Sequence, residues 1–573
     1  MQPNNNHNDR RVAYLSMEIA LEAQIPTYSG GLGVLAGDTL RSAADLEVPM
    51  VAVTLVHRKG YFKQHLDRAG RQTEEPDTWD PSQRLAPVAA KVPVEIEGRQ
   101  VLVGAWRYEV QGISGHRIPV YLLDSDQPEN APEDRALTDT LYGGDDRYRL
   151  AQEAVLGLGG VALLNAAGHS GIESWHMNEG HSSLLTLALL EQEMGAGGAP
   201  TEAHILAVRR ECIFTTHTPV PAGHDKFGWD LVRRVLGENR TTLLEQTGCA
   251  HEGMLNMTYL ALRFSRYVNG VAMHHGQVSR GMFPAYPIHA ITNGVHAATW
   301  ASPAFRKLYD QHVPEWRVDN LYLRYAIGIP PADIQEAHRQ AKRALLDELS
   351  LRAGARFDES IFTIGFARRA TAYKRADLVF SDPKRLRSIA RKFGPLQMVY
   401  GGKAHPHDEP GKNLIREVFR DAAGLADVLR FVYVENYDMR WAQFMTAGVD
   451  LWLNTPLRPQ EASGTSGMKA AMNGVPSLSV LDGWWMEGCF EGVTGWPIGH
   501  ERDPLNVDPA SESDSLYDAL EEQILPAYYR RPDDYAAIMR SAIALNASFF
   551  NTQRMLEQYE MNAYYPETLE PAE

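Results

Sequence analysis

The sequence predicts an α/β protein built from two doubly wound halves, each with its own parallel sheet. Apolar runs, glycine-rich or polar loops and amphipathic stretches follow one another repeatedly, which is typical of parallel α/β sheets. The length of 573 residues exceeds one typical core and indicates two or more domains. Nearly every polar motif follows an apolar run, and such sheets bind ligands beyond the carboxyl ends of their strands.

The first half begins with the order strand, loop, helix and strand. We expect the apolar run from Val12 to Met17 to form a buried strand. The loop SGGLG at 29–33 leads into an amphipathic stretch from about Leu32 to Leu46, which is followed by another apolar run. The same order recurs in three later segments: 171–194, 204–220 and 287–300.

The second half begins after Trp300 and repeats this order. Apolar spacing predicts a helix over Asp333 to Leu351 and a strand over Phe362 to Phe366. Further short apolar runs end in polar or glycine-rich loops: LQMVYGGKA, VLRFVYVENYD, GVDLWLNTP and PSLSVLDG. The stretch TQRMLEQYEMNAYY predicts a terminal helix. We therefore expect an N-terminal domain at 1–300 and a second domain at 301–544.

Composition excludes several classes of protein. The formal net charge of −16 argues against a general binder of nucleic acid or anionic membranes. The cysteines Cys212, Cys249 and Cys489 are widely spaced and form no metal or redox pattern, which suits a reducing cytoplasm. The polar N-terminus lacks the apolar core of a signal peptide, and the apolar stretch from Ala154 to Leu164 is shorter than a membrane span. We expect a cytoplasmic protein.

The glycine loop at 29–33 has two interpretations. Glycines let the backbone approach a ligand closely, and the helix that follows would offer unpaired N–H groups to an anion. Glycine-rich turns before helices are also common where nothing binds. The loop does not fit the GxGxxG spacing, so a nicotinamide cofactor is not supported.

A basic cluster follows the strand predicted at Phe362 to Phe366. Its sequence RRATAYKR, residues 368–375, contains four cations in eight positions. Most charge runs are solvated helix faces. However, Arg368 and Arg369 adjoin a strand that should be buried, where unpaired cations are costly. Because a phosphate dianion would offset that cost through bidentate guanidinium bonds, we favour an anion site.

The segment PQEASGTSGMKAAMNGVP, residues 459–476, places Glu461 and Lys469 around a loop with little bulk. It fails the Walker A pattern because Ala470 follows the lysine. Small residues could cradle a phosphate at a helix N-terminus: Ser463, Gly464, Thr465, Ser466 and Gly467. We expect Lys469 in the first helical turn, where the dipole and desolvation would lower its pKa and favour capture of an aldehyde cofactor. From these residues alone, an ordinary surface lysine is the preferred interpretation, ahead of this chemical role.

Histidines and an asparagine also follow predicted strands. The segment HMNEGH at 176–181 matches neither HExxH nor HxxEH, so we expect no metal site. His217 in FTTHTPV and Asn293 in ITNGV could point into a cleft between the two sheets. The simpler alternatives are a satisfied structural histidine and a plain turn.

Taken together, these segments resemble the α-glucan phosphorylase family, which comprises the glycogen, starch and maltodextrin phosphorylases, and in particular its short bacterial branch. The most specific stretch is EASGTSGMKAAMNG, which is similar to the family's EASGTGNMK, where the lysine carries pyridoxal phosphate. Other motifs occur in family order: RVAYLSMEIA, SGGLGVLAGD, RLAQE, HMNEGHS, FTTHTP, ITNGVHAATW, AYKRADL, YGGKA and VENYD. The resemblance runs from about Val12 to the terminal helix.

The resemblance implies a GT-B fold, in which two Rossmann-like domains face a common cleft and a C-terminal helix, about 545–573, crosses back to the first domain. It implies reversible phosphorolysis of α-1,4-glucans (glycogen, starch or maltodextrin) by inorganic phosphate to α-glucose 1-phosphate, with retention. The phosphate of pyridoxal 5'-phosphate would serve as acid and base, and no metal is needed. A homodimer is the family's usual arrangement.

The matching motifs imply a role for each site residue. The cofactor side comprises the Schiff-base lysine, the phosphate ligands and a packing tyrosine: Lys469, Arg368, Gly464, Thr465, Ser466 and Tyr437. The substrate phosphate would be held by the basic cluster and the glycine loop: Arg369, Lys374, Tyr373, Gly31 and Leu32. The glucosyl unit would contact four residues, the first mainly through its backbone carbonyl: His217, Asn293, Glu461 and Ser463. The expected catalytic residues are Lys469, Arg369, Lys374 and His217.

Two departures from the family pattern bear on these roles. Arg368 stands where longer members usually have lysine, a change that keeps the positive charge, so we expect cofactor binding to persist. After LDG, the longer members have Ala-Asn-Val where this chain has Trp484-Trp485-Met486. The resemblance therefore does not define the contacts with the glucan acceptor or the preferred chain length.

Two alternatives come from other functional classes. A nucleotide-sugar glycosyltransferase, such as a glycogen or starch synthase, shares the fold and a similar glycine loop. It needs no aldehyde cofactor, so Lys469 distinguishes it from a phosphorylase. A catalytically silent glucan-binding regulator would require a damaged phosphate site, whereas Arg369, Lys374 and Lys469 are all present.

Overall fold

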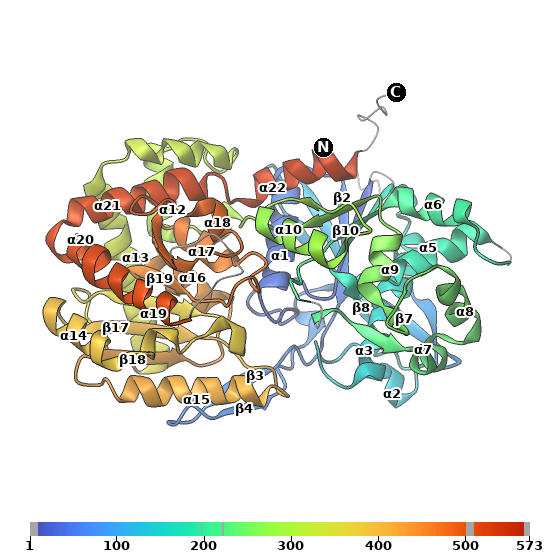
Figure 1. Ribbon diagram of the computed structural model, residues 1–573. Helices are drawn as coiled ribbons and strands as arrows, with labels where there is room; N and C mark the ends of the chain where they lie inside the picture. Colours follow the sequence, from blue (N-terminus) through green and yellow to red (C-terminus); the bar gives the residue numbers. More distant parts are fainter. Residues whose placement is uncertain (1–9, 196–197, 221–222, 500–508, 566–573) are drawn as a thin grey trace.

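The computed structural model describes residues 10–195, 198–220, 223–499 and 509–565. Two sheets of mainly parallel strands organise these residues, one from each half of the chain (Figure 1). Their central strands are buried along their whole length, as expected where helices cover both faces of a parallel sheet. Among the described helices, none is both long and apolar enough to cross a membrane.

The first sheet has the strand order β15-β14-β10-β9-β1-β2-β8-β7-β5, with β6 paired to β7. Its strands up to β8 run parallel: β15 (His289–Ala290), β14 (Tyr267–Gly270), β10 (Cys212–Thr215), β9 (Ser174–Asn178), β1 (Val12–Ser16), β2 (Met50–Leu55) and β8 (Arg117–Asp124). The remaining strands pair antiparallel: β7 (Arg99–Gln111), β5 (Ala86–Pro87) and β6 (Val92–Ile96). Helix α1 (Gly31–Asp45) connects β1 to β2 and buries its apolar face on the sheet.

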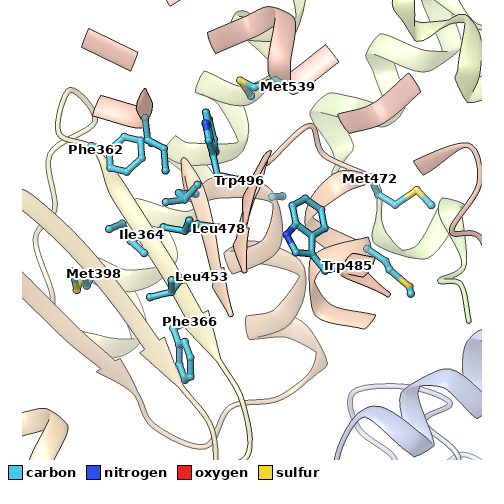
Figure 2. Close-up of a cluster of buried hydrophobic side chains, with 14 of the residues drawn as sticks. Phe362, Ile364, Phe366, Met398, Leu453, Met472, Leu478, Trp485, Trp496 and Met539 are labelled. Atoms are coloured by element: carbon cyan, nitrogen blue, oxygen red, sulfur yellow. The ribbon is translucent and has the colours of Figure 1, made fainter. Parts of the chain in front are cut away.

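The second sheet is entirely parallel, in the order β18-β17-β16-β19-β20-β21. Its strands are β18 (Leu429–Val434), β17 (Leu396–Gly401), β16 (Thr363–Ala367), β19 (Leu451–Asn454), β20 (Ser477–Val480) and β21 (Gly495–Ile498). Phe362, Ile364 and Leu453 lie in its core with Trp485 and Trp496 (Figure 2). That core also takes in Ala20, Val34 and Val295 of the first half, so one apolar cluster joins the two sheets.

The structure confirms the elements that rest on strong periodicity. The apolar run at Val12 to Met17 forms β1, and the helix expected from about Leu32 is α1. The helix predicted over Asp333 to Leu351 is α13 (Pro331–Ala353), and the run at Phe362 to Phe366 lies in β16 with a one-residue shift. The continuous apolar runs form strands that are buried along their whole length, and the apolar residues at helical spacing form the buried side of α13.

The terminal helix packs on the first sheet although it follows the second in sequence (Figure 1). Helix α22 (Thr552–Tyr559) continues into the π-helical segment η11 (Glu560–Tyr564). Met555, Leu556 and Tyr559 lie in the same apolar cluster as Val12. The Thr552 hydroxyl is 2.6 Å from the hydroxyl of Ser42 on α1. Of the expected C-terminal segment, 566–573 lies outside the described residues, as does 1–9 of the expected first domain.

A hairpin from the first half reaches the second sheet. Strands β3 (Lys63–Leu66) and β4 (Gln72–Glu75) lie beside helix α15 (Glu409–Ala423) in Figure 1. The side-chain amide of Gln64 donates to the Gly402 carbonyl at 2.9 Å, and that of Gln72 donates to the Ala404 carbonyl at 2.8 Å. Both carbonyls follow β17, so the hairpin fixes a loop at the end of a second-sheet strand.

We expect Gln72→Ala to lower the free energy of unfolding by about 1–3 kcal/mol, because it leaves the buried Ala404 carbonyl without its donor. Urea unfolding followed by circular dichroism measures the change. His65→Ala is the matched control on the same hairpin, since its contact with Glu435 involves a side chain that is 51% exposed and should contribute under about 0.5 kcal/mol. Equal effects of the two variants would contradict a structural role for the buried amide.

Candidate active site

Loops that follow strands of both sheets meet at the junction between them. The glycine loop follows β1, and Trp300 ends helix α11 (Ala297–Trp300) after β15. Arg369 follows β16, and Lys469 follows β19 in helix α17 (Thr465–Ala471). The Lys469 Nζ lies 4.2 Å from the centroid of the Trp300 ring. A Cβ added to Gly30 would lie 3.9 Å from Cδ of Arg369. The structure therefore places Lys469 beside Trp300, and the glycine loop beside the segment that follows β16.

Lys469 is a buried lysine, only 6% exposed, which excludes the surface-lysine alternative. Burial lowers the pKa of its ammonium to about 8; Asp38 opposes this shift and Arg368 adds to it. The Trp300 indole that lies over Lys469 donates to the Asp38 carboxylate at 2.6 Å. Asp38 and Trp300 therefore fix the wall against which the amine packs.

The position of Lys469 within its helix differs from the prediction. Helix α17 begins at Thr465, so Lys469 is the fifth of seven residues and lies in the last turn, not the first. A helix dipole favours a cation there. The lowered pKa consequently arises from burial and from Arg368, and the expected dipole contribution was wrong.

The basic cluster carries its own counter-ion. Glu461, 7% exposed, forms ion pairs with the guanidinium of Arg368 and with Lys374 Nζ, the latter at 2.5 Å. Burial alone would raise the pKa of Glu461, but the two cations lower it to about 2. Arg368 therefore does not need an external phosphate to offset its charge, contrary to the expectation from sequence, because this carboxylate already does so.

Arg369 behaves differently from Arg368. Its side chain is exposed to solvent, and it has no carboxylate partner within the residues that the structure describes. Lys374 Nζ lies 4.5 Å from the centroid of the Tyr373 ring. Burial raises the pKa of Tyr373, but Lys374 and Arg369 outweigh it and the pKa is lowered overall. The field at this point is strongly positive, which suits an anion.

Two residues expected to bind sugar are buried with unused polar atoms. Asn293 is 2% exposed, and neither its Oδ1 nor the Oγ of Ser463 has a hydrogen-bond partner among the described residues. Buried polar atoms rarely lack partners, so each indicates a ligand group or water. His217 follows β10 in the chain, and its Nε2 pairs with Asn178 Oδ1 at 2.7 Å. Burial lowers the pKa of His217 to about 4, so it is neutral near pH 7.

The loop before α17 has the form of a phosphate nest. Gly464 adopts φ 88° and ψ 50°, a left-handed conformation that favours glycine, and Thr465 begins the helix. Ser466 Oγ accepts hydrogen bonds from Arg368 at 3.2 Å and from the Trp452 indole at 3.1 Å. The Tyr437 ring lies close to the end of β17, where a Cβ added to Gly401 would be 2.9 Å from it.

The tryptophans Trp484 and Trp485 are core residues, 2% and 0% exposed. The Trp484 ring lies under α17, where a Cβ added to Gly467 would be 2.7 Å from it, and the backbone N–H of Trp484 donates to the Ser463 carbonyl at 2.9 Å. Figure 2 shows Trp485 within the core of the second sheet. Their aromatic rings therefore support the loop from beneath. Because both rings are buried, they offer no exposed surface to a glucan acceptor.

Sequence reasoning missed Glu18, which follows β1 directly. Its carboxylate accepts hydrogen bonds from the backbone N–H groups of Ser29 and Gly30, at 2.6 and 3.2 Å, and from the Tyr142 hydroxyl at 2.9 Å. Two N–H groups of the glycine loop are thus already occupied, which leaves Gly31 and Leu32 at the start of α1 as the candidates for an anion. An acidic residue directly after a buried strand was the signal that could have identified it.

We expect the rate of reductive methylation of Lys469 to rise with pH up to about 8 and then level off, because only the neutral amine attacks an aldehyde. Exposed lysines should keep gaining reactivity to about pH 10. Peptide mass mapping of cofactor-free protein, treated with formaldehyde and cyanoborohydride at a series of pH values, measures both. A profile for Lys469 that still rises above pH 9 would show that its amine is not desolvated.

Comparison with known proteins agrees with this geometry. A family model described as carbohydrate phosphorylase matches residues 233–489. Over 97% of its length, the chain is 38% identical to a maltodextrin phosphorylase of Thermococcus litoralis and covers 71% of that protein. It is 35% identical, again over 97% of its length, to a glycogen phosphorylase of Aquifex aeolicus, 86% of which it covers. An uncharacterized protein of Methanocaldococcus jannaschii is 30% identical over 96% of this chain and 99% of its own length.

The lysine, the basic cluster and the small-residue loop that meet at the junction all lie within the aligned regions of these relatives. Identity at this level across nearly the whole chain shows common descent and not a shared local motif. The chain therefore belongs to the carbohydrate phosphorylase family, among the α-glucan phosphorylases.

Proposed function

We propose that the chain is an α-glucan phosphorylase, which transfers the terminal α-1,4-linked glucose of glycogen, starch or maltodextrin to inorganic phosphate and releases α-glucose 1-phosphate with retention. The observation that carries the proposal is the buried amine of Lys469 near Arg368, which shares the Glu461 carboxylate with Lys374. A nucleotide-sugar glycosyltransferase has no use for such an amine.

The same proposal extends to the fold. We assign a GT-B arrangement with domains at 1–300 and 301–544 and a crossover at about 545–573. Two separate, mainly parallel sheets and the packing of α22 on the first sheet support this division. The wide spacing of Cys212, Cys249 and Cys489, which forms no metal or redox pattern, supports a cytoplasmic location, and the homodimer stays a prediction from the resemblance.

Pyridoxal 5'-phosphate fits the residues present. Lys469 offers an amine with lowered pKa for the aldehyde. Gly464, Thr465 and Ser466 form a nest to which Arg368 is already hydrogen-bonded, and Tyr437 lies at the end of β17. When bound, the cofactor supplies a phosphate whose pKa near ~6 suits proton exchange at neutral pH.

The chain's own residues would organise charge around the reaction. Arg369 is exposed and free to bind the substrate phosphate, with the N–H groups of Gly31 and Leu32 at the start of α1. Lys374 would join it when released from Glu461. These cations would stabilise the developing ion pair between an oxocarbenium-like sugar and phosphate.

The sugar would be held on the opposite side of the phosphate by neutral groups. The unused Asn293 Oδ1 and Ser463 Oγ can bond to sugar hydroxyls, and so can the backbone carbonyl of His217. Glu461 can reach the sugar only by giving up a cation, so phosphate and sugar binding are coupled through this one carboxylate.

We expect Lys469→Ala to abolish release of glucose 1-phosphate from maltodextrin and phosphate, because the cofactor loses its anchor. Borohydride reduction and peptide mapping of protein supplied with pyridoxal phosphate should find the added mass on Lys469 alone. An unmodified Lys469 would defeat the cofactor assignment. Failure of the wild-type chain to release sugar phosphate from any of these glucans would defeat the reaction.

We expect Arg369→Ala to raise the KM for phosphate by about 10- to 100-fold, the scale of a lost charge-assisted hydrogen bond. The KM for maltodextrin should change little, because Asn293 and Ser463 are untouched. Arg391→Ala on helix α14 (Pro383–Phe393) is a control, since that side chain is 69% exposed and pairs only at the surface. Wild-type phosphate dependence in Arg369→Ala would show that the anion binds elsewhere.

A further inference from the structure

The loop that carries Asn293 is held from outside the first half of the chain. We call residues 292–295, Thr292 to Val295, the sugar loop. It follows the two-residue strand β15, and the Asn293 N–H donates to the Val271 carbonyl at 3.0 Å. Residues from distant segments of the chain also contact this loop. Its position decides where the unused Oδ1 of Asn293 points.

Residues at and before the terminal helix form hydrogen bonds with the backbone of the sugar loop. Arg554 on α22 donates from Nη1 to the Thr292 carbonyl at 2.6 Å and from Nη2 to the Asn293 carbonyl at 3.1 Å. Gly294 lies so close to the Asn551 backbone that an added Cβ would be 2.2 Å from it. Val295 exchanges hydrogen bonds with both sides of Asn551: its N–H donates to the Phe550 carbonyl, and its carbonyl accepts from the Thr552 N–H, each at 3.1 Å.

A segment of the second half also forms hydrogen bonds with the sugar loop. Glu487, in the short helix α18 (Trp485–Gly488), accepts from the Thr292 hydroxyl at 2.8 Å. Its other oxygen accepts at 2.9 Å from the N–H of Met273, the first residue of helix α10 (Met273–Met282). Asp482, just before α18, accepts from the Glu461 N–H at 2.9 Å. One segment, 482–487, thus contacts the sugar loop and the backbone of Glu461.

We propose that Arg554 and Glu487 are positioning residues for the glucosyl unit: they hold the sugar loop so that Asn293 faces the substrate in register with Glu461. This inference rests on the proposed function and assigns a sugar-side role to the C-terminal helix. It separates the sugar contacts, held by Arg554 and Glu487, from the phosphate contacts, held by the segment after β16.

The geometry requires a guanidinium at position 554. Two carbonyls of consecutive residues are bridged by two nitrogens of one planar group, which a lysine ammonium cannot reproduce. A third nitrogen, Nε, donates to the Phe549 carbonyl at 2.9 Å, and the Phe549 ring lies 4.6 Å from the guanidinium carbon. Burial lowers the pKa of Arg554 to about 10, so it stays charged at neutral pH and its hydrogen bonds are charge-assisted.

Arg266 provides a matched control because it also holds the C-terminal segment by its backbone. Its Nη2 donates to the Ala563 carbonyl at 2.7 Å and to the Ser174 hydroxyl at 2.9 Å. Neither partner belongs to the sugar loop. Arg266→Lys therefore loosens the end of the chain without releasing Asn293, whereas Arg554→Lys does both.

The experiment compares wild type, Arg554→Lys, Glu487→Gln and Arg266→Lys as cofactor-loaded proteins. We expect Arg554→Lys to raise the KM for maltodextrin about tenfold, the scale of one charge-assisted hydrogen bond, with the KM for phosphate within about twofold of wild type. Glu487→Gln should change the same KM in the same direction by less, because it keeps one acceptor for Thr292. Arg266→Lys should leave both constants unchanged.

Calorimetric titration with maltoheptaose gives a readout that does not depend on turnover, and it should show the same order of affinities. The proposal fails if Arg554→Lys weakens maltoheptaose no more than Arg266→Lys does, or if it raises both KM values equally. If Arg554→Lys does not fold, unaltered maltoheptaose binding by Glu487→Gln overturns the proposal. A wild type that binds maltoheptaose but releases no sugar phosphate would defeat the proposed function, and the titrations would still decide this inference.

Discussion

The buried carboxylate of Glu461 between Arg368 and Lys374 is the interaction on which the geometry of the site depends. Two cations so close together repel each other, and withdrawal from water makes each of them costly. One carboxylate within reach of both offsets that cost, as its pKa of about 2 reflects. The basic segment after β16 can therefore lie inside an acidic protein with no ligand bound.

This constraint explains why so many distant segments converge on one loop. Glu461 can serve both cations only if the chain before α17 is held in place, and Asp482 holds its backbone N–H. Trp484 supports the same loop from beneath, and Trp300 with Asp38 forms the wall beside Lys469. Apolar packing that joins the two sheets supplies the rigidity these contacts need.

Local sequence patterns predicted the strands, the helices and the polar motifs that follow strands. They did not predict features that depend on contacts between distant residues. Strand β16 and helix α13 follow from periodicity, and the position of polar motifs after strands identified Lys469 and Arg369. The start of α17 depends on the left-handed Gly464, which residue types alone did not reveal, so Lys469 was placed in the wrong turn. The grip of Arg554 on Asn293 joins residues 261 positions apart and leaves no local signal.

In the proposed function, Glu461 would also determine the order in which the ion pairs rearrange when substrates bind. Arg368 and Lys374 both pair with this single carboxylate, whereas Arg369 forms no ion pair within the described residues. An incoming phosphate would therefore meet Arg369 first and would then compete with Glu461 for Lys374. As Glu461 loses a cation it gains hydrogen-bonding capacity, which sugar hydroxyls can satisfy. In the proposed function, competition for one cation would thus couple phosphate binding to sugar binding.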